Sequence, residues 1–124
     1  MKTAAFLAGL AALLLCVTVS AAENWKAVNG ASLGVLLPGK ELGDDVHFAY
    51  RFGNDGTFAG TEMGKDVRGK WRVAADEICW TWTRPPGAEE CYTVEIDGAA
   101  VRMLRNGSEA WYGTLKPAKH SMRR

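Results

Sequence analysis

Few residues of this sequence have types and spacing suited to catalysis. The two histidines are His47 and His120, and no HExxH or phosphate-loop spacing occurs. A hydrolytic triad needs a histidine oriented beside a nucleophile, whereas His47 is expected on the polar face of a strand and His120 lies in the tail. The adjacent acids Glu89 and Glu90 are expected to be solvated loop charges. We therefore expect a protein that is not an enzyme and has no catalytic residue, metal or cofactor.

The cysteines favour a structural role. Cys16 lies in an apolar N-terminal run, which leaves Cys79 and Cys91 as a pair. Two cysteines are too few for a structural zinc site, and their spacing is not that of a CxxC redox motif. We expect a disulfide between them, formed in an oxidising compartment.

Aromatic residues offer a possible binding site. Five of them are expected on the inward faces of strands and could line an apolar ligand cavity: Tyr50, Trp71, Trp80, Trp82 and Tyr92. Alternatively, they fill the core of a barrel too small to hold a cavity. The sequence favours the filled core, and a ligand cavity is the alternative.

The first 22 residues predict export. Lys2 precedes a run without charge that ends at Ser20-Ala21-Ala22, and Glu23 is the first acid. This is typical of a signal peptide spanning residues 1–22. A retained membrane anchor needs a longer apolar run of about 20 residues, and lipidation of Cys16 is disfavoured by Leu15 before it. We expect a periplasmic or secreted protein that leaves the membrane after cleavage.

The charge of the remaining chain excludes a broad nucleic-acid interface. Of the 15 basic residues Lys2 leaves with the signal, so the mature chain balances 14 bases against 14 acids. Without a net positive field, we expect no nucleic-acid partner. The tail from about residue 116 is basic and is interpreted as a solvated terminus.

Short alternating runs separated by turn residues predict strands. The clearest has Val67, Gly69, Trp71 and Val73 on one face and basic residues on the other. Residues 31–37 could form a helix or a first strand, and we favour a helical turn that packs across one end of a sheet. Further strands are expected over residues 46–52, 57–63, 78–83, 91–96, 99–105 and 110–115.

Every connection between these runs is short, which favours pairing in sequence order. We predict one all-β domain over residues 23–124, an antiparallel meander that forms an up-and-down barrel or a curled sheet. If Cys79 lies opposite Cys91, the hairpin centres on Pro85 and Ile78 faces Tyr92. The disulfide would then fix the register of this hairpin.

Several motifs in order resemble a group of short exported bacterial proteins of uncharacterised function. They are the turn Asp55-Gly56-Thr57, the strand Gly69-Lys70-Trp71, and the two cysteines around the strand that carries Trp80 and Trp82. The resemblance covers most of the mature chain. It implies a periplasmic, lipocalin-like or similar β fold and transfers no catalytic residue.

Two hypotheses for function follow. The first is an exported binding module for a small apolar ligand in the barrel mouth or for a protein partner. The alternative is a periplasmic interaction or inhibitor domain that acts through the proline-containing loop 84–90, which projects from the bridged hairpin.

Overall fold

The computed structural model describes Gly9 and residues 23–118, so the predicted signal peptide and residues 119–124 lie outside the described residues. The described part contains nine strands and one short helix. In chain order they are β1 (Lys26–Ala27), α1 (Gly30–Leu36), β2 (Lys40–Gly43), β3 (Phe48–Phe52), β4 (Thr57–Glu62), β5 (Lys65–Ala74), β6 (Glu77–Arg84), β7 (Glu90–Asp97), β8 (Ala100–Arg105) and β9 (Ser108–Pro117).

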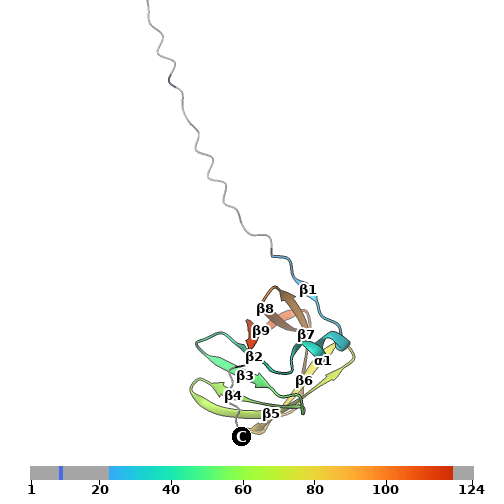
Figure 1. Ribbon diagram of the computed structural model, residues 1–124, viewed down its shortest axis with the longest axis vertical. Helices are drawn as coiled ribbons and strands as arrows, with labels where there is room; N and C mark the ends of the chain where they lie inside the picture. The colour runs from blue at the N-terminus through green and yellow to red at the C-terminus, as the bar shows by residue number, and fades with distance from the viewer. Residues whose placement is uncertain (1–8, 10–22, 119–124) are drawn as a thin grey trace, which may run out of the picture.

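Strands β2 to β9 form a closed antiparallel barrel in sequence order, which confirms the predicted meander (Figure 1). β2 pairs with β9 to close it, and β7 pairs with both β6 and β8. The two-residue strand β1 pairs with the C-terminal part of β7, beyond the part that pairs with β6. Closure leaves no long sheet edge unpaired within the barrel.

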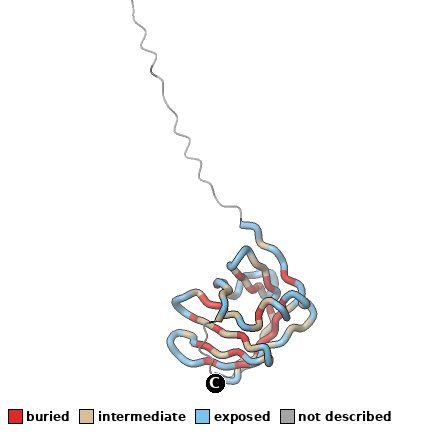
Figure 2. Tube along the Cα trace, viewed as in Figure 1, coloured by how far each residue is buried: buried red, intermediate tan, exposed pale blue. Residues whose placement is uncertain are grey.

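Buried and exposed positions alternate along the strands, as Figure 2 shows. On β5, Val67 and Gly69 are buried whereas Arg68 and Lys70 are exposed, which confirms the predicted faces of this strand. The same alternation on β3 buries Phe48, Tyr50 and Phe52. The inward side chains of all strands therefore meet in one apolar core.

The β6–β7 hairpin has the predicted register. Cys79 pairs with Cys91, and Ile78 pairs with Tyr92. The two cysteines form a disulfide, with 4.0 Å between their Cα atoms. One register therefore places the sulfurs on the outer face and the large apolar side chains in the barrel.

Helix α1 closes one end of the barrel, which confirms the predicted helical turn. Its N-cap residue Asn29 accepts a hydrogen bond from the backbone N–H of Ser32. Leu33 and the C-cap Leu37 are fully buried against the core. The loops at the other end, which we call the open end, join β2 to β3, β4 to β5, β6 to β7, and β8 to β9.

Two details differ from the sequence prediction. The strand predicted from Val46 begins at Phe48, because the Asp44 carboxylate accepts hydrogen bonds from the backbone N–H groups of Val46, His47 and Phe48 and holds them in a loop. Val46 is consequently 78% exposed instead of inward. Lys40–Gly43 forms a strand that the sequence pattern did not predict.

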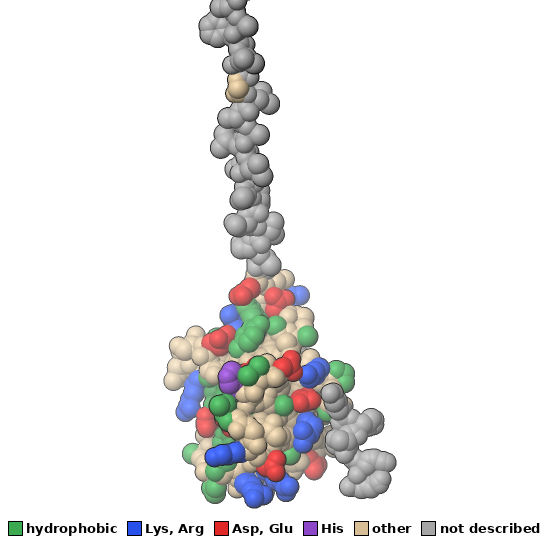
Figure 3. All heavy atoms as spheres, turned by 90° about the vertical axis from the view of Figure 1, so that its left-hand side faces the viewer, with side chains coloured by type: hydrophobic (Ala, Val, Ile, Leu, Met, Phe, Trp, Pro, Cys, Tyr) green, Lys and Arg blue, Asp and Glu red, His purple; other side chains and the backbone are tan. Residues whose placement is uncertain are grey.

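Charges of both signs are interspersed on the surface that Figure 3 shows. Scattered hydrophobic side chains lie between them. Within the described part of the chain, no helix has the length and apolar character required to cross a bilayer.

Candidate functional site

Four of the five aromatic residues singled out in the sequence lie together. The ring centroid of Tyr50 is 5.8 Å from that of Trp80 and 5.4 Å from that of Trp82. The ring centroids of Trp80 and Tyr92 are 5.3 Å apart. Tyr50 and Trp80 are fully buried, Tyr92 is nearly so, and Trp82 is partly exposed. The rings therefore contact one another in the core, and Trp82 connects this group to the surface.

Trp71, the fifth residue, lies apart from that group. Its ring packs edge-on against Phe52 at 5.7 Å. Its indole N–H donates to the backbone carbonyls of Gly53, at 3.0 Å, and Thr57, at 3.1 Å. This ring therefore supports the turn between β3 and β4, near the helix end of the barrel.

A pocket of about 290 Å³ lies at the open end. Strands β4, β6, β7 and β9 and the β6–β7 loop all contribute to it. Its lining consists of Glu62, Trp82, Pro85, Pro86, Glu90 and Trp111. We call this site the mouth pocket. It combines two carboxylates with two indole rings.

Trp111 joins the mouth pocket to the buried aromatic group. Its ring centroid is 5.9 Å from that of Tyr50 and 5.7 Å from that of Trp80. Phe48 packs against Trp111 at 5.2 Å. A ligand in the pocket would therefore rest on a continuous aromatic floor.

Strand register explains why both carboxylates belong to this end. Glu62 is the last residue of β4 and pairs with buried Phe48, so it shares the inward face. Glu90 precedes buried Tyr92 by two residues and has the same orientation. The expectation of a solvated loop charge at Glu90 was wrong, because Glu90 is the half-buried first residue of β7.

Sequence reasoning did not select Glu62, Glu90 or Trp111 as site residues. A two-residue period extended from Phe58 through Gly60 reaches Glu62, and one extended back from Tyr92 reaches Glu90. The alternation of each strand therefore indicated that both glutamates face inward. Their convergence at one end depends on the closure of the barrel.

The two carboxylates differ in their surroundings. Glu90 accepts a hydrogen bond from the Tyr92 hydroxyl, and its Oε2 lies 3.7 Å from Nη1 of Arg105. Burial, together with this hydrogen bond, raises the pKa of Tyr92. Glu62 has no ion pair or hydrogen bond to another side chain among the residues that the structure describes. Its charge is therefore the less compensated one.

Two buried polar atoms next to this site have no hydrogen-bond partner in the described part of the chain: the Tyr50 hydroxyl and Nε1 of Trp80. Burial raises the pKa of Tyr50, and the adjacent Glu62 carboxylate raises it further through its charge and as an acceptor for the hydroxyl. Buried polar groups are normally paired, and exceptions often mark functional sites.

His47 lies at the open end but outside the mouth pocket. Its side chain is 61% exposed, and its Nδ1 is 2.6 Å from Oδ2 of Asp44. Partial burial acts to raise the pKa of Asp44, but the hydrogen bonds from Val46, His47 and Phe48 together lower it well below its ordinary value. This pair organises the β2–β3 loop.

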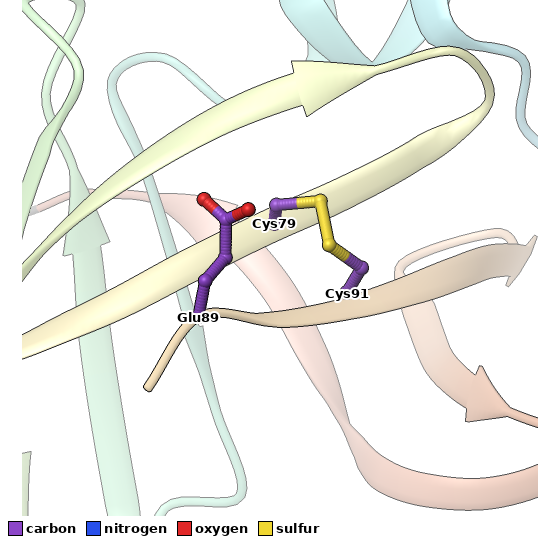
Figure 4. Close-up of side chains that lie close together, drawn as sticks. All are labelled: Cys79, Glu89 and Cys91. Atoms are coloured by element: carbon purple, nitrogen blue, oxygen red, sulfur yellow. A yellow bond between two sulfur atoms is a disulfide. The ribbon is translucent and has the colours of Figure 1, made fainter. Parts of the chain in front are cut away.

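One cluster of three potential metal ligands occurs within the described residues: Cys79, Glu89 and Cys91 (Figure 4). Both sulfurs belong to the disulfide and so offer no thiolate to a metal. The Glu89 carboxylate instead binds the Arg72 guanidinium through two hydrogen bonds, of 2.6 and 2.9 Å. This cluster therefore stabilises the outer face of the hairpin.

Comparisons with known proteins returned no relative of this chain. No protein-family model, no curated protein and no solved structure matches it significantly.

Proposed function

We propose that this protein is an exported, non-enzymatic binding module whose ligand occupies the mouth pocket. One observation carries the proposal: two inward carboxylates, two indole rings and an unpartnered buried hydroxyl meet at the end of the barrel that the helix does not close. Binding sites commonly combine apolar walls with a few convergent polar groups. The resemblance to short exported proteins supports only the export of this protein.

The ligand sits on the aromatic group, not between its rings. Tyr50 and Trp80 are fully buried and in edge contact, so they act as a floor. Trp82 and Trp111 are partly exposed and act as walls. A ligand that fits a pocket of about 290 Å³ is small, or is one side chain of a larger partner.

Indole N–H signals in proton–nitrogen correlation spectra test this proposal. Mature protein is titrated with a panel of small polar, apolar and charged compounds. A ligand of the mouth pocket shifts the signals of Trp82 and Trp111. The signal of Trp25 serves as the internal control, because its ring packs on Tyr112 and under Arg102 outside this pocket. Compounds that shift Trp25 alone, or no indole at all, would contradict a mouth site.

A second candidate is a protein-interaction or inhibitor domain that acts through the 84–90 loop. The observation that favours it is that Pro85 and Pro86 line the mouth pocket and are themselves exposed. A protein partner would then contact the loop and the pocket together. Replacement of both prolines by alanine should remove such a partner from non-reducing pull-downs, and an unchanged set of partners would exclude this loop.

A further inference from the structure

The mouth pocket carries an excess of negative charge. Glu90 is compensated by the Tyr92 hydroxyl and by Arg105, whose side chain is 55% exposed. Glu62 has neither kind of partner within the described residues. Lys65 is the cross-strand partner of Glu62, but its side chain is exposed and forms no ion pair with this half-buried carboxylate, which loses part of its hydration. A bound cation would restore that interaction.

The two indole rings that form the walls of the mouth pocket also favour a positively charged ligand. The faces of Trp82 and Trp111 carry negative electrostatic potential, and a cation within about 6 Å of such a ring is attracted to it. An anion in this pocket would meet two carboxylates. A purely apolar ligand would cover the carboxylates without pairing them.

The Tyr50 hydroxyl lies beside Glu62 and adds a polar group below the mouth pocket. Tyr50 is fully buried, its ring contacts Trp82 and Trp111, and Glu62 is the charge that most affects its pKa. The hydroxyl can donate to Glu62 after a small adjustment, which leaves the other carboxylate oxygen for a donor in the pocket. Carboxylate, hydroxyl and ring faces together form a receptor for N–H donors with positive charge.

We infer that the mouth pocket binds a cationic nitrogen group, an alkylammonium or a guanidinium, between Glu62 and the indole rings of Trp82 and Trp111. This inference rests on the proposed function and specifies the ligand class. The group belongs either to a small molecule or to a lysine or arginine side chain of a protein partner. Both sources present the same chemistry to the pocket.

The test uses three probes of equal chain length that differ in charge: n-butylammonium, n-butanol and butyrate. Their binding to the mature protein is followed through the indole signals of Trp82 and Trp111. We expect butylammonium to bind at least about ten-fold more tightly than butanol, the factor that one charge-assisted hydrogen bond supplies. Butyrate should bind most weakly.

Glu62→Gln removes the charge and keeps the shape, so it should abolish the preference for butylammonium over butanol. Glu89→Gln is the matched control, because Glu89 lies on the neighbouring loop but pairs with Arg72 beside the disulfide. This control should keep the preference. The unperturbed Trp25 signal reports that each variant remains folded.

The outcomes separate the two proposals. Equal binding of butylammonium and butanol at the mouth overturns the cationic ligand class and leaves the binding module intact. Saturable binding that is unaffected by Glu62→Gln also overturns the inference. If none of the three probes binds, and a lysine-containing peptide with acetylated and amidated ends does not bind either, both the binding module and the cationic ligand class are overturned. Binding of that peptide but not of butylammonium supports the inference and identifies the source as a protein side chain.

Discussion

The hydroxyl of Tyr50 lies beside the carboxylate of Glu62 within an apolar barrel core and forms no hydrogen bond of normal geometry. Across the same core, the Tyr92 hydroxyl donates to Glu90. Two tyrosines on facing strands thus have similar burial and different hydrogen bonding. Substitution of each tyrosine by phenylalanine therefore tests the hydrogen bonding of these two hydroxyls beside the mouth pocket.

Tyr50→Phe should stabilise the protein by about 1 kcal/mol, because an unpartnered buried hydroxyl costs free energy that phenylalanine avoids. Tyr92→Phe should destabilise it by about 1–2 kcal/mol, since it removes a hydrogen bond to a charged group. Denaturant unfolding measures both free energies. Equal losses in the two variants would show that the Tyr50 hydroxyl has a partner.

Stability should fall at alkaline pH. Burial raises the pKa of both Tyr50 and Tyr92, so the folded state keeps protons that the unfolded state releases above its ordinary value of 10.0. The stabilising contribution is complete below that pH and is lost as the pH rises above it. Each tyrosine contributes a slope of up to about 1.4 kcal/mol per pH unit. Unfolding midpoints between pH 9 and 11 should therefore decline less steeply in Tyr50→Phe than in the wild type.

Acid should loosen the β2–β3 loop. The pKa of Asp44 is lowered in the folded protein, so its stabilising effect is present above the ordinary value of 3.8 and is lost as the pH falls below it. Asp44→Asn should reduce the difference between unfolding midpoints at pH 6 and pH 3. Glu109→Gln, at an exposed acid of β9, is the control and should leave that difference unchanged.

Loss of the disulfide should lower stability without changing the fold. Replacement of both Cys79 and Cys91 by alanine should cost about 3 kcal/mol, the value of the chain-entropy model for a loop of this length. The nearby Arg72–Glu89 ion pair is exposed and screened by solvent, so Arg72→Gln should cost much less than loss of the disulfide. Denaturant unfolding compares the variants, and similar losses would contradict this ranking.

The predicted signal peptide should be removed on export. Intact mass measured without reductant should correspond to a chain that starts near Ala22 or Glu23 and is lighter by two hydrogens than the reduced form. N-terminal sequencing locates the cleavage. A protein that retains Met1, or that carries a lipid at Cys16, would contradict the predicted signal peptide.

The antiparallel meander could be predicted from local information, because most strands have a polar and an apolar face and most turns have suitable residues. The pairing of Cys79 with Cys91 followed from the same alternation. Strand β2 was missed because Lys40–Gly43 is only four residues long and its inward Leu42 has no alternating neighbours. Val46 was misplaced because a side chain, Asp44, binds the backbone and ends the pattern.

The sequence by itself determined the inward-facing residues, since a strand has a period of two. Only the tertiary structure decided which of them meet. Closure of β2 on β9 brings Glu62, Glu90 and Trp111 to one end, although they come from three separate strands. The same closure leaves Trp71 near the other end. Position along the barrel axis depends on strand registers and on ring closure, and these are set by contacts between residues far apart in the chain.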